Sequence, residues 1–537
     1  MSHGRARREP NVTAVQLAQP FDRRQLFRRA GALAAVAGPA IVLGACGGGE
    51  PPPVTVPTTI GGPPNWGALA SSLQGNVVLP TDATFATDKP LFDTRFDGLN
   101  PAAIAFCRSP TDVQRCVDFA RRSGVQLTAR SGGHSYAGYS TCPGLIVDVT
   151  GMADVTVANG TTAVIGAGAR LIDIYGTLGP AGVLLPGGSC PTVGIAGLTL
   201  GGGIGVLGRR YGLACDNVSS LDIVTADGRL LTCDAEQNPD LYWASRGGGG
   251  GNFGIVTSFT FDVHPIPDIA LFTLDWPGAS AAAVLDTWLR WLPSTPDELW
   301  ANCQLDSSGG TDGGPSVRVT GVYAGSVSDC SAALAPLLSA VGVAPSDQFV
   351  GPETYERAMM IEAGCENLSV AQCHLPSQNA AGTLDRSTFA AASAYVFEPF
   401  PAAALDAATQ AVANAGPTPF GGAVLFDGYG GAIARIPGDA TAFAHRGAIA
   451  GIQYYASWDP SAPRSVTDAA TAWLASTSSA LDRYTKGAYV NYIDPAQPDY
   501  LNAYYGANLA RLVDVKRAVD PDDLFHFAQS IPTALPA

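Results

Sequence analysis

The stretch Arg130-Ser131-Gly132-Gly133-His134-Ser135-Tyr136 decides the fold. It follows residues 125–129, which alternate like a strand, and a second apolar strand comes at 145–149. A strand that runs into a glycine turn exposes successive backbone N–H groups, which can hold a pyrophosphate. A histidine at the tip of such a turn lies beside whatever binds there. Taken alone, the stretch is more typical of an ordinary turn that carries a surface histidine.

A second glycine cluster covers 187–208 and contains Gly203-Ile204-Gly205-Val206-Leu207-Gly208, a literal G-x-G-x-x-G. Asp222 lies about twenty residues beyond Gly203, the first glycine of this motif, where a nicotinamide-binding fold keeps its ribose-binding acid. That fingerprint needs a strand, a tight turn and then a helix. Here the glycines begin early, and Arg209-Arg210-Tyr211-Gly212 would stop a helix at once. We therefore reject a nicotinamide site.

The third cluster contains five consecutive glycines, 247–251, ahead of Asn252-Phe253-Gly254-Ile255-Val256. Five glycines in an ordered loop cost much backbone entropy, and close approach of the backbone to an extended ligand is the plainest reason to keep them. Together, the three clusters predict one large ligand that is wrapped by backbone.

Composition narrows the class of protein. The chain has 537 residues, enough for two or three domains, and 46% of them are hydrophobic. Its net charge of −15 argues against nucleic acid as a partner, because that affinity comes mostly from Lys and Arg. There is no Cys-x-x-Cys pair and the six His are scattered, so we expect no zinc site.

The N-terminus has the features of an export signal. Residues 1–29 are rich in Arg, 30–45 are small and apolar, and Leu43-Gly44-Ala45-Cys46 closes the run. Arg23-Arg24 resembles a twin-arginine signal, and the closing residues resemble a lipobox with Cys46 as lipid anchor. A membrane-spanning helix is the alternative, but the apolar run falls short of the roughly 20 residues such a helix needs. We expect an exported protein, either secreted or held at the cell surface.

Eleven cysteines are present, and an oxidising compartment permits disulfides. Cys365/Cys373 and Cys303/Cys330 are the candidate pairs, although sequence alone does not fix connectivity.

Hydrophobic periodicity predicts an α+β fold. A helix is expected to start at Ser109-Pro110-Thr111-Asp112, and Asp227-Gly228 is expected to form a hairpin turn. From about residue 266 the composition shifts to Ala, Ser, Thr and Pro, which indicates a second domain over 266–480. Its expected helices are 280–292, 330–341 and 463–482, and its expected strands are 317–322, 395–397, 423–426 and 451–457.

In combination, the three clusters resemble the FAD-binding domain of the vanillyl-alcohol-oxidase/PCMH superfamily, and specifically the berberine bridge enzyme-like oxidoreductases. The resemblance covers about 98–265 and resumes at 486–532, in Ala488-Tyr489-Val490-Asn491-Tyr492 and Gln529-Ser530-Ile531-Pro532. It implies a PCMH-type FAD-binding domain of two subdomains, and a substrate domain with an antiparallel sheet covered by helices. The expected organisation is a signal peptide (1–46), a Gly/Pro linker (47–75), the FAD-binding domain (76–265), the substrate domain (266–480) and a C-terminal berberine-bridge segment (481–537).

By this resemblance, FAD is bound covalently, through His134 to its 8α carbon and through Cys190 to its C6. A small buried cysteine is the alternative interpretation of Cys190. The other residues implied to line the cofactor are Arg130, Ser131, Gly132, Gly133, Ser135, Tyr136, Gly188, Val193, Gly194, Gly197, Gly254, Ile255, Val256 and Asn491.

The implied chemistry is oxidation of a small-molecule alcohol or hemiacetal, in which a base removes the hydroxyl proton while hydride passes to the flavin. Tyr492 and Tyr489 are the candidate bases, or else packing residues; Gln453 is a candidate substrate contact, and Asp427 could assist the base. Plant alcohol-oxidising members resemble G-G-G-Y-G at the second cluster, whereas this chain has Ile204, so its base must come from elsewhere.

Val193 occupies a position where a small residue is associated with oxygen access, which favours O2 as the electron acceptor. A dehydrogenase with another acceptor is the first alternative. A lipid-anchored binding protein without catalysis is the second.

Overall fold

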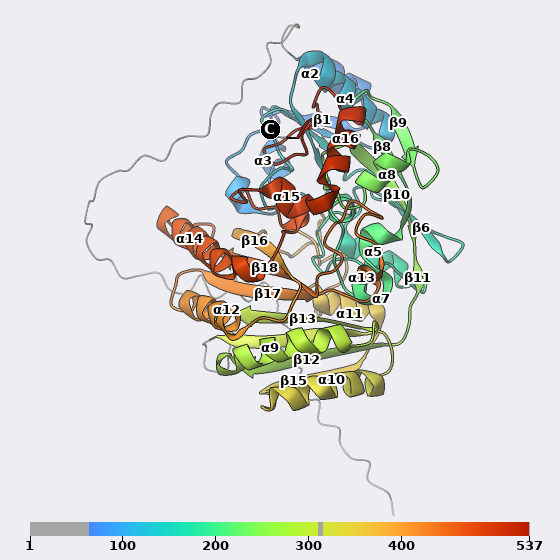
Figure 1. Cartoon of the computed structure of the whole chain (residues 1–537). Helices are drawn as coiled ribbons and strands as arrows, with labels where there is room; N and C mark the ends of the chain where they lie inside the picture. Colours follow the sequence, from blue (N-terminus) through green and yellow to red (C-terminus); the bar gives the residue numbers. More distant parts are fainter. Residues whose placement is uncertain (1–63, 310–314, 536–537) are drawn as a thin grey trace, which may run out of the picture.

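The computed structural model describes residues 64–309 and 315–535. The predicted signal peptide and most of the predicted linker lie outside the described residues. Figure 1 shows one lobe with two small sheets above a second lobe that is built on one large sheet. Within the described ranges, no helix has both the length and the apolar character needed to cross a membrane.

The first small sheet delivers the stretch that decides the fold. Its order is β1 (Asn76–Val78), β2 (Ala103–Phe106), β4 (Leu145–Asp148) and β3 (Leu127–Arg130), with β2, β4 and β3 parallel. The predicted start of helix α4 (Pro110–Ser123) is confirmed, because the Ser109 side chain accepts a hydrogen bond from the Asp112 N–H. Since β3 ends at Arg130, the glycine turn and His134 follow at the edge of the sheet.

The second small sheet is antiparallel, in the order β5 (Val155–Ala158), β6 (Thr162–Gly166), β10 (Ile255–Asp262), β8 (Val218–Val224) and β9 (Leu230–Cys233). The predicted hairpin at Asp227-Gly228 joins β8 to β9. The G-x-G-x-x-G runs into α7 (Gly208–Tyr211), a single helical turn, in place of the longer helix that a nicotinamide fingerprint requires.

The large sheet is antiparallel, in the order β15 (Asp347–Glu353), β12 (Ile269–Pro277), β14 (Ser316–Tyr323), β13 (Leu299–Asp306), β17 (Gly421–Gly428), β18 (Ala450–Ser457) and β16 (Phe389–Val396). One face is covered by α9 (Ala281–Trp291), α10 (Val327–Val341), α12 (Ala402–Ala415) and α14 (Arg464–Leu481) (Figure 1). Trp276, Trp288 and Phe426 are fully buried in the core between the sheet and these helices. The α+β prediction is confirmed; β12, β13, β15 and α12 were not predicted.

The C-terminal segment returns to the first lobe, where α15 (Tyr500–Tyr505) and α16 (Leu509–Val519) lie (Figure 1). Leu512 and Ile531 share a core with Leu145 and Phe259. Shorter helices precede or connect these sheets and helices: α2 (Trp66–Ser72), α3 (Phe85–Asp88), η2 (Thr94–Phe96), α5 (Leu171–Leu178), α6 (Ile195–Leu200), α11 (Tyr355–Glu362) and η7 (Val490–Tyr492).

One of the two candidate disulfides is present. Cys365 and Cys373 are bonded, as expected. The Cys303/Cys330 pairing is wrong: both residues are buried and outside any disulfide. Cys303 lies on β13 and Cys330 on α10, where both pack as small apolar side chains in the core of the second lobe.

Candidate functional site

A cavity separates the glycine clusters from the face of the large sheet that α9, α10, α12 and α14 leave uncovered. Its cofactor side contains every residue expected to line the cofactor, namely Arg130–Tyr136, Gly188, Cys190, Val193, Gly194, Gly197, Gly254–Val256 and Asn491. Its opposite side is formed by side chains of the large sheet, among them Asn302, Gln304, Thr320, Asp427 and Tyr455.

The glycines of the cofactor side form a cradle that fits a long ligand. At Gly194, a Cβ atom would collide with Ser131 and Gly132, so these turns need glycine in order to pack together. Gly197 is different, because a Cβ there would meet no atom within 4 Å, and at Gly250 the nearest atom would be 3.8 Å away. A glycine inside helix α6 costs about 1 kcal/mol relative to alanine. Since the protein itself leaves room for a side chain at Gly197, close approach of a ligand explains the glycine.

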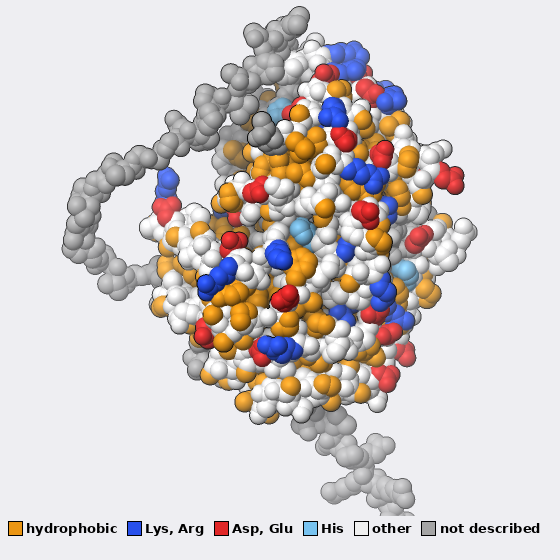
Figure 2. All heavy atoms as spheres, viewed as in Figure 1, with side chains coloured by type: hydrophobic (Ala, Val, Ile, Leu, Met, Phe, Trp, Pro, Cys, Tyr) orange, Lys and Arg blue, Asp and Glu red, His pale blue; other side chains and the backbone are white. Residues whose placement is uncertain are grey.

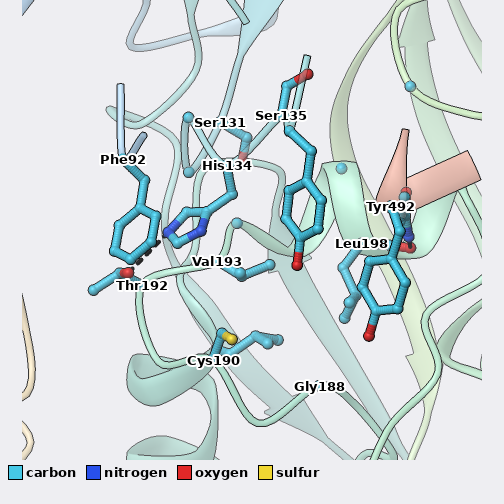
Figure 3. A pocket seen from close by; sticks show the side chains of 18 of the residues that line it. Phe92, Ser131, His134, Ser135, Gly188, Cys190, Thr192, Val193, Leu198 and Tyr492 are labelled. Carbon is cyan, nitrogen blue, oxygen red and sulfur yellow. Dashed lines mark hydrogen bonds between the residues drawn. The ribbon is translucent and has the colours of Figure 1, made fainter. Parts of the chain in front are cut away.

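His134 is held in a defined orientation at the edge of the cavity. Its Nε2 lies 2.8 Å from Thr192 Oγ1, and its ring stacks on Phe92 with 4.1 Å between ring centres (Figure 3). Loss of solvation, helped by the positive charge of Arg170, lowers the pKa of His134 to about 3. The imidazole is therefore neutral near pH 7. When Nε2–H donates to Thr192, Nδ1 keeps its lone pair.

Cys190 borders the same space. Figure 3 shows His134, Val193 and Cys190 around one opening, with Tyr492 across it. Of the eight cysteines outside a disulfide in the described part of the chain, the other seven are buried, whereas Cys190 is partly exposed and lines the cavity. This exposure favours a role toward a ligand over packing.

Tyr492 and Asp427 face each other from different lobes. Tyr492 ends η7, and its hydroxyl lies 3.4 Å from Asp427 Oδ2 on β17. The Tyr136 ring stacks on Tyr492, with ring centres 5.4 Å apart and planes within 9° of parallel. Asn302 on β13 is the strand partner of Asp427, so the two side chains are neighbours on the sheet face. The arrangement is a phenol beside a carboxylate within a ligand cavity.

Tyr489 has a different environment from Tyr492. Its hydroxyl oxygen accepts hydrogen bonds from Gly203 N–H (2.9 Å), Ile204 N–H (3.2 Å) and Asn491 Nδ2 (2.9 Å). Burial raises the pKa of Tyr489 to about 12. Its hydroxyl is thus committed to the glycine turn around Ile204, where it anchors the backbone.

Gln453, expected to contact substrate, is fully buried and does not border the cavity. Its Nε2 donates a hydrogen bond to the Tyr136 hydroxyl over 2.8 Å. Because Tyr136 lines the cavity, the Gln453 amide supports a cavity residue from behind the lining.

Several cavity residues escaped sequence reasoning. Thr192 lies inside the second glycine cluster, but only the fold brings it against His134. Phe92 lies in a segment without a motif. Asn302 and Thr320 are strand partners on the sheet face, and Asn302 Oδ1 accepts a hydrogen bond from Gln304 Nε2 (3.2 Å). The alternation of polar residues at 302 and 304 was the one available sequence signal for the sheet side of the cavity.

The fold and the site define a class of protein: a two-lobed fold with a glycine-lined cradle for a long ligand and a tyrosine–carboxylate pair opposite it. The family profile described as FAD binding domain matches residues 101–234, and the profile described as Berberine and berberine like matches 488–532.

Similar proteins include the uncharacterized FAD-linked oxidoreductase YgaK of Bacillus subtilis, 33% identical over 80% of this chain and 91% of that protein. The solved structure of Physcomitrella patens BBE-like 1 has a TM-score of 0.80 and 30% identity, and covers 88% of this chain and 100% of that one. A carbohydrate oxidase of Microdochium nivale is 29% identical over 87% of this chain and 95% of that protein. The chain belongs to the berberine bridge enzyme-like FAD-linked oxidoreductases, and FAD is its cofactor.

Proposed function

We propose that this enzyme oxidises a C–OH group, of a sugar hemiacetal or a secondary-metabolite alcohol, with O2 as the final acceptor. The observation that carries the proposal is the Tyr492–Asp427 pair, which borders the cavity across from His134 and Cys190. The similarity to a carbohydrate oxidase supports a sugar in particular.

Tyr492 is the base in this proposal. Its hydroxyl takes the proton of the substrate hydroxyl and passes its own proton toward Asp427, 3.4 Å away. Bound FAD supplies the acceptor for the hydride that leaves the substrate carbon. Asn302 and Thr320 line the same side of the cavity and can donate or accept hydrogen bonds that orient further hydroxyls of the substrate. Tyr489, with its hydroxyl turned to backbone amides, holds the turn and takes no proton.

The same proposal includes two covalent links to FAD. A neutral His134, with Nε2 facing Thr192, keeps a nucleophilic nitrogen, and Cys190 offers a sulfur on the same side of the cavity. Two links would raise the flavin potential and leave the site open for bulky substrates. Val193, between them in Figure 3, leaves a small side chain at the opening, which favours access of O2.

Two measurements test this function. Acid-denatured protein is digested, and the peptides that contain His134 and Cys190 are examined for flavin by mass and absorbance. A panel of aldoses, oligosaccharides and alcohols is then screened for flavin bleaching without air and for hydrogen peroxide release in air. Bleaching with peroxide supports an oxidase, and bleaching without peroxide makes the enzyme a dehydrogenase with another acceptor. No bleaching with any substrate would favour a non-catalytic binding protein.

Export is also part of the proposal, on the strength of Arg23-Arg24 and Leu43-Gly44-Ala45-Cys46. Twin-arginine export carries folded proteins, which suits an enzyme that acquires FAD before it leaves the cytoplasm. The intact mass of the mature protein tests this: a chain that starts at a lipidated Cys46 supports a lipoprotein, and a chain with an intact N-terminus contradicts export.

A further inference from the structure

Phe92 is a half-buried residue on the loop between α3 and η2, far from the glycine clusters in sequence. Its ring stacks face to face on the ring of His134, with 4.1 Å between centres and an angle of 19° between planes (Figure 3). Its backbone N–H donates to Gly133 O (3.1 Å), and its carbonyl accepts from Ser387 N–H (3.1 Å). Phe92 thus contacts both lobes and the histidine that lies between them.

The loop that carries Phe92 is fixed on each side. Arg130 Nη1 donates to Lys89 O over 3.3 Å, and Arg386 Nε donates to Leu91 O over 2.6 Å. Arg130 itself pairs with Asp148 through a buried contact of 2.5 Å. Because these hydrogen bonds fix the loop on both sides, the Phe92 ring keeps a constant position relative to His134.

An imidazole has two rotations about its side-chain bonds, and two contacts are enough to fix them. The stack on Phe92 sets the plane of the His134 ring, and the hydrogen bond from Nε2 to Thr192 sets its direction within that plane. With both fixed, Nδ1 points in one direction only. Bond formation is fast when the reacting atom is held in position in advance, and slow when it must be found by rotation.

We propose that Phe92 is a positioning residue for the covalent attachment of FAD through His134. The inference rests on the proposed attachment and deepens it. Formation of the link joins an imidazole nitrogen to the flavin methyl carbon, with loss of one hydrogen from each; the two electrons and two protons pass to dioxygen, which becomes hydrogen peroxide.

Phe92 also packs against two small hydrophobic clusters, one around Leu375 and Leu384 and one around Phe389 and Tyr455. A merely structural role would therefore lower the stability of the protein as a whole. The attachment at Cys190 separates the two roles, because the ring of Phe92 stacks on His134, the other attachment residue, and so acts on its orientation in particular. The ratio of His134-linked to Cys190-linked flavin in the same molecules is the decisive readout.

The test follows attachment with time in the full-length protein. Cells that express wild type, Phe92→Ala, Phe92→Leu or Phe92→Tyr are sampled at intervals, and the protein is acid-denatured and digested. We expect attachment at His134 to be roughly 2- to 10-fold slower in Phe92→Ala and Phe92→Leu, the range for loss of one aromatic contact, with attachment at Cys190 unchanged. Phe92→Tyr keeps the stack and should restore the wild-type ratio.

Three further variants complete the test. Thr192→Val removes the other restraint and should slow attachment at His134 as well, whereas Thr192→Ser should not. Phe119→Ala is the matched control, because Phe119 is a half-buried ring that packs on Trp66 and not on His134. A wild-type ratio in Phe92→Leu overturns the positioning role. Absence of flavin on His134 in the wild type overturns the attachment itself, which is a separate and distinguishable failure.

Discussion

The cofactor side of the cavity presents mainly backbone, whereas the substrate side presents mainly side chains. On the first side, Gly197 and Gly250 leave open space where a ligand must approach closely. On the second, Asn302, Thr320 and Asp427 project from three neighbouring strands. Backbone recognition by glycine turns tolerates few sequences. Side-chain recognition on a sheet can be changed one residue at a time, so we expect the substrate side to set the specificity of this enzyme.

The largest effect on catalysis is expected at Tyr492, which lies between the cofactor side and the substrate side of the cavity. Tyr492→Phe removes the proposed base and should lower kcat by about 10²- to 10⁴-fold, the usual contribution of a positioned acid or base. FAD content should stay at the wild-type level, because the substitution keeps the ring that stacks on Tyr136 and removes only the hydroxyl that lies against Asp427. Rapid-mixing measurement of flavin reduction checks the rate. Wild-type reduction in Tyr492→Phe would exclude this tyrosine as the base.

The second prediction concerns the support of the substrate side. The disulfide Cys365–Cys373 closes a short loop within the segment 364–384, whose end residues Gly364 and Leu384 border the cavity. In the same segment, His374 Nε2 lies 3.1 Å from Asp173 Oδ2 on α5. Replacing both cysteines by serine should lower the free energy of local opening by about 2–3 kcal/mol, as expected for a loop this short. Hydrogen exchange over 365–384 measures this. FAD retention is the control, and its loss would mean that the two sides are not independent.

This contrast explains what the sequence could and could not predict. The cradle was predictable because glycine is required by backbone geometry, which leaves a local pattern at 130–136, 187–208 and 247–254. His134 and Cys190 lie inside those patterns. Asn302, Thr320 and Phe92 were not predictable, because a strand partner or a ring stack depends on register and packing between distant segments. The Cys303/Cys330 pairing failed for the same reason: two apolar core positions leave no local sign of their distance.

The third prediction tests substrate orientation on the sheet face. Asn302→Ala should raise KM by roughly 2- to 10-fold with kcat nearly unchanged, because it removes a hydrogen bond made equally to bound substrate and to the transition state. Steady-state kinetics with the best substrate of the panel measure both constants. Gln348→Ala, on the exposed edge strand β15 outside the cavity, is the matched control. A fall in kcat with constant KM would instead assign Asn302 to the proton transfer through Asp427.

The fourth prediction concerns a mutation on the cofactor side that should stabilise the FAD-free protein, whereas most mutations destabilise a protein. Gly197→Ala adds a methyl group where the protein has room, so the FAD-free protein should gain up to about 1 kcal/mol of stability from helix propensity. The same methyl group occupies ligand space, and FAD content should fall. Thermal unfolding of the FAD-free form and flavin absorbance of the purified protein give the two values. Gly67→Ala in helix α2 is the control, because it should stabilise without any effect on FAD.

The smallest expected effect is that of pH on the rate of flavin attachment at His134, which should not change between pH 8 and pH 5. An ordinary histidine becomes protonated as the pH falls through about 6.5, so flavin attachment by such a residue would slow between pH 8 and pH 5. Burial and Arg170 hold the pKa of His134 at about 3, so its imidazole stays neutral across this whole range. The rate of attachment at His134, measured on FAD-free protein after FAD is added, should therefore be flat from pH 8 to pH 5.

The variant Arg170→Met removes one of the two causes that lower the pKa of His134, and it should move the onset of slowing to higher pH. Burial, the larger cause, remains in this variant. A wild-type rate that already falls near pH 6.5 would mean that water reaches the imidazole before FAD does, and the backbone cradle would then be formed by the cofactor and not ahead of it.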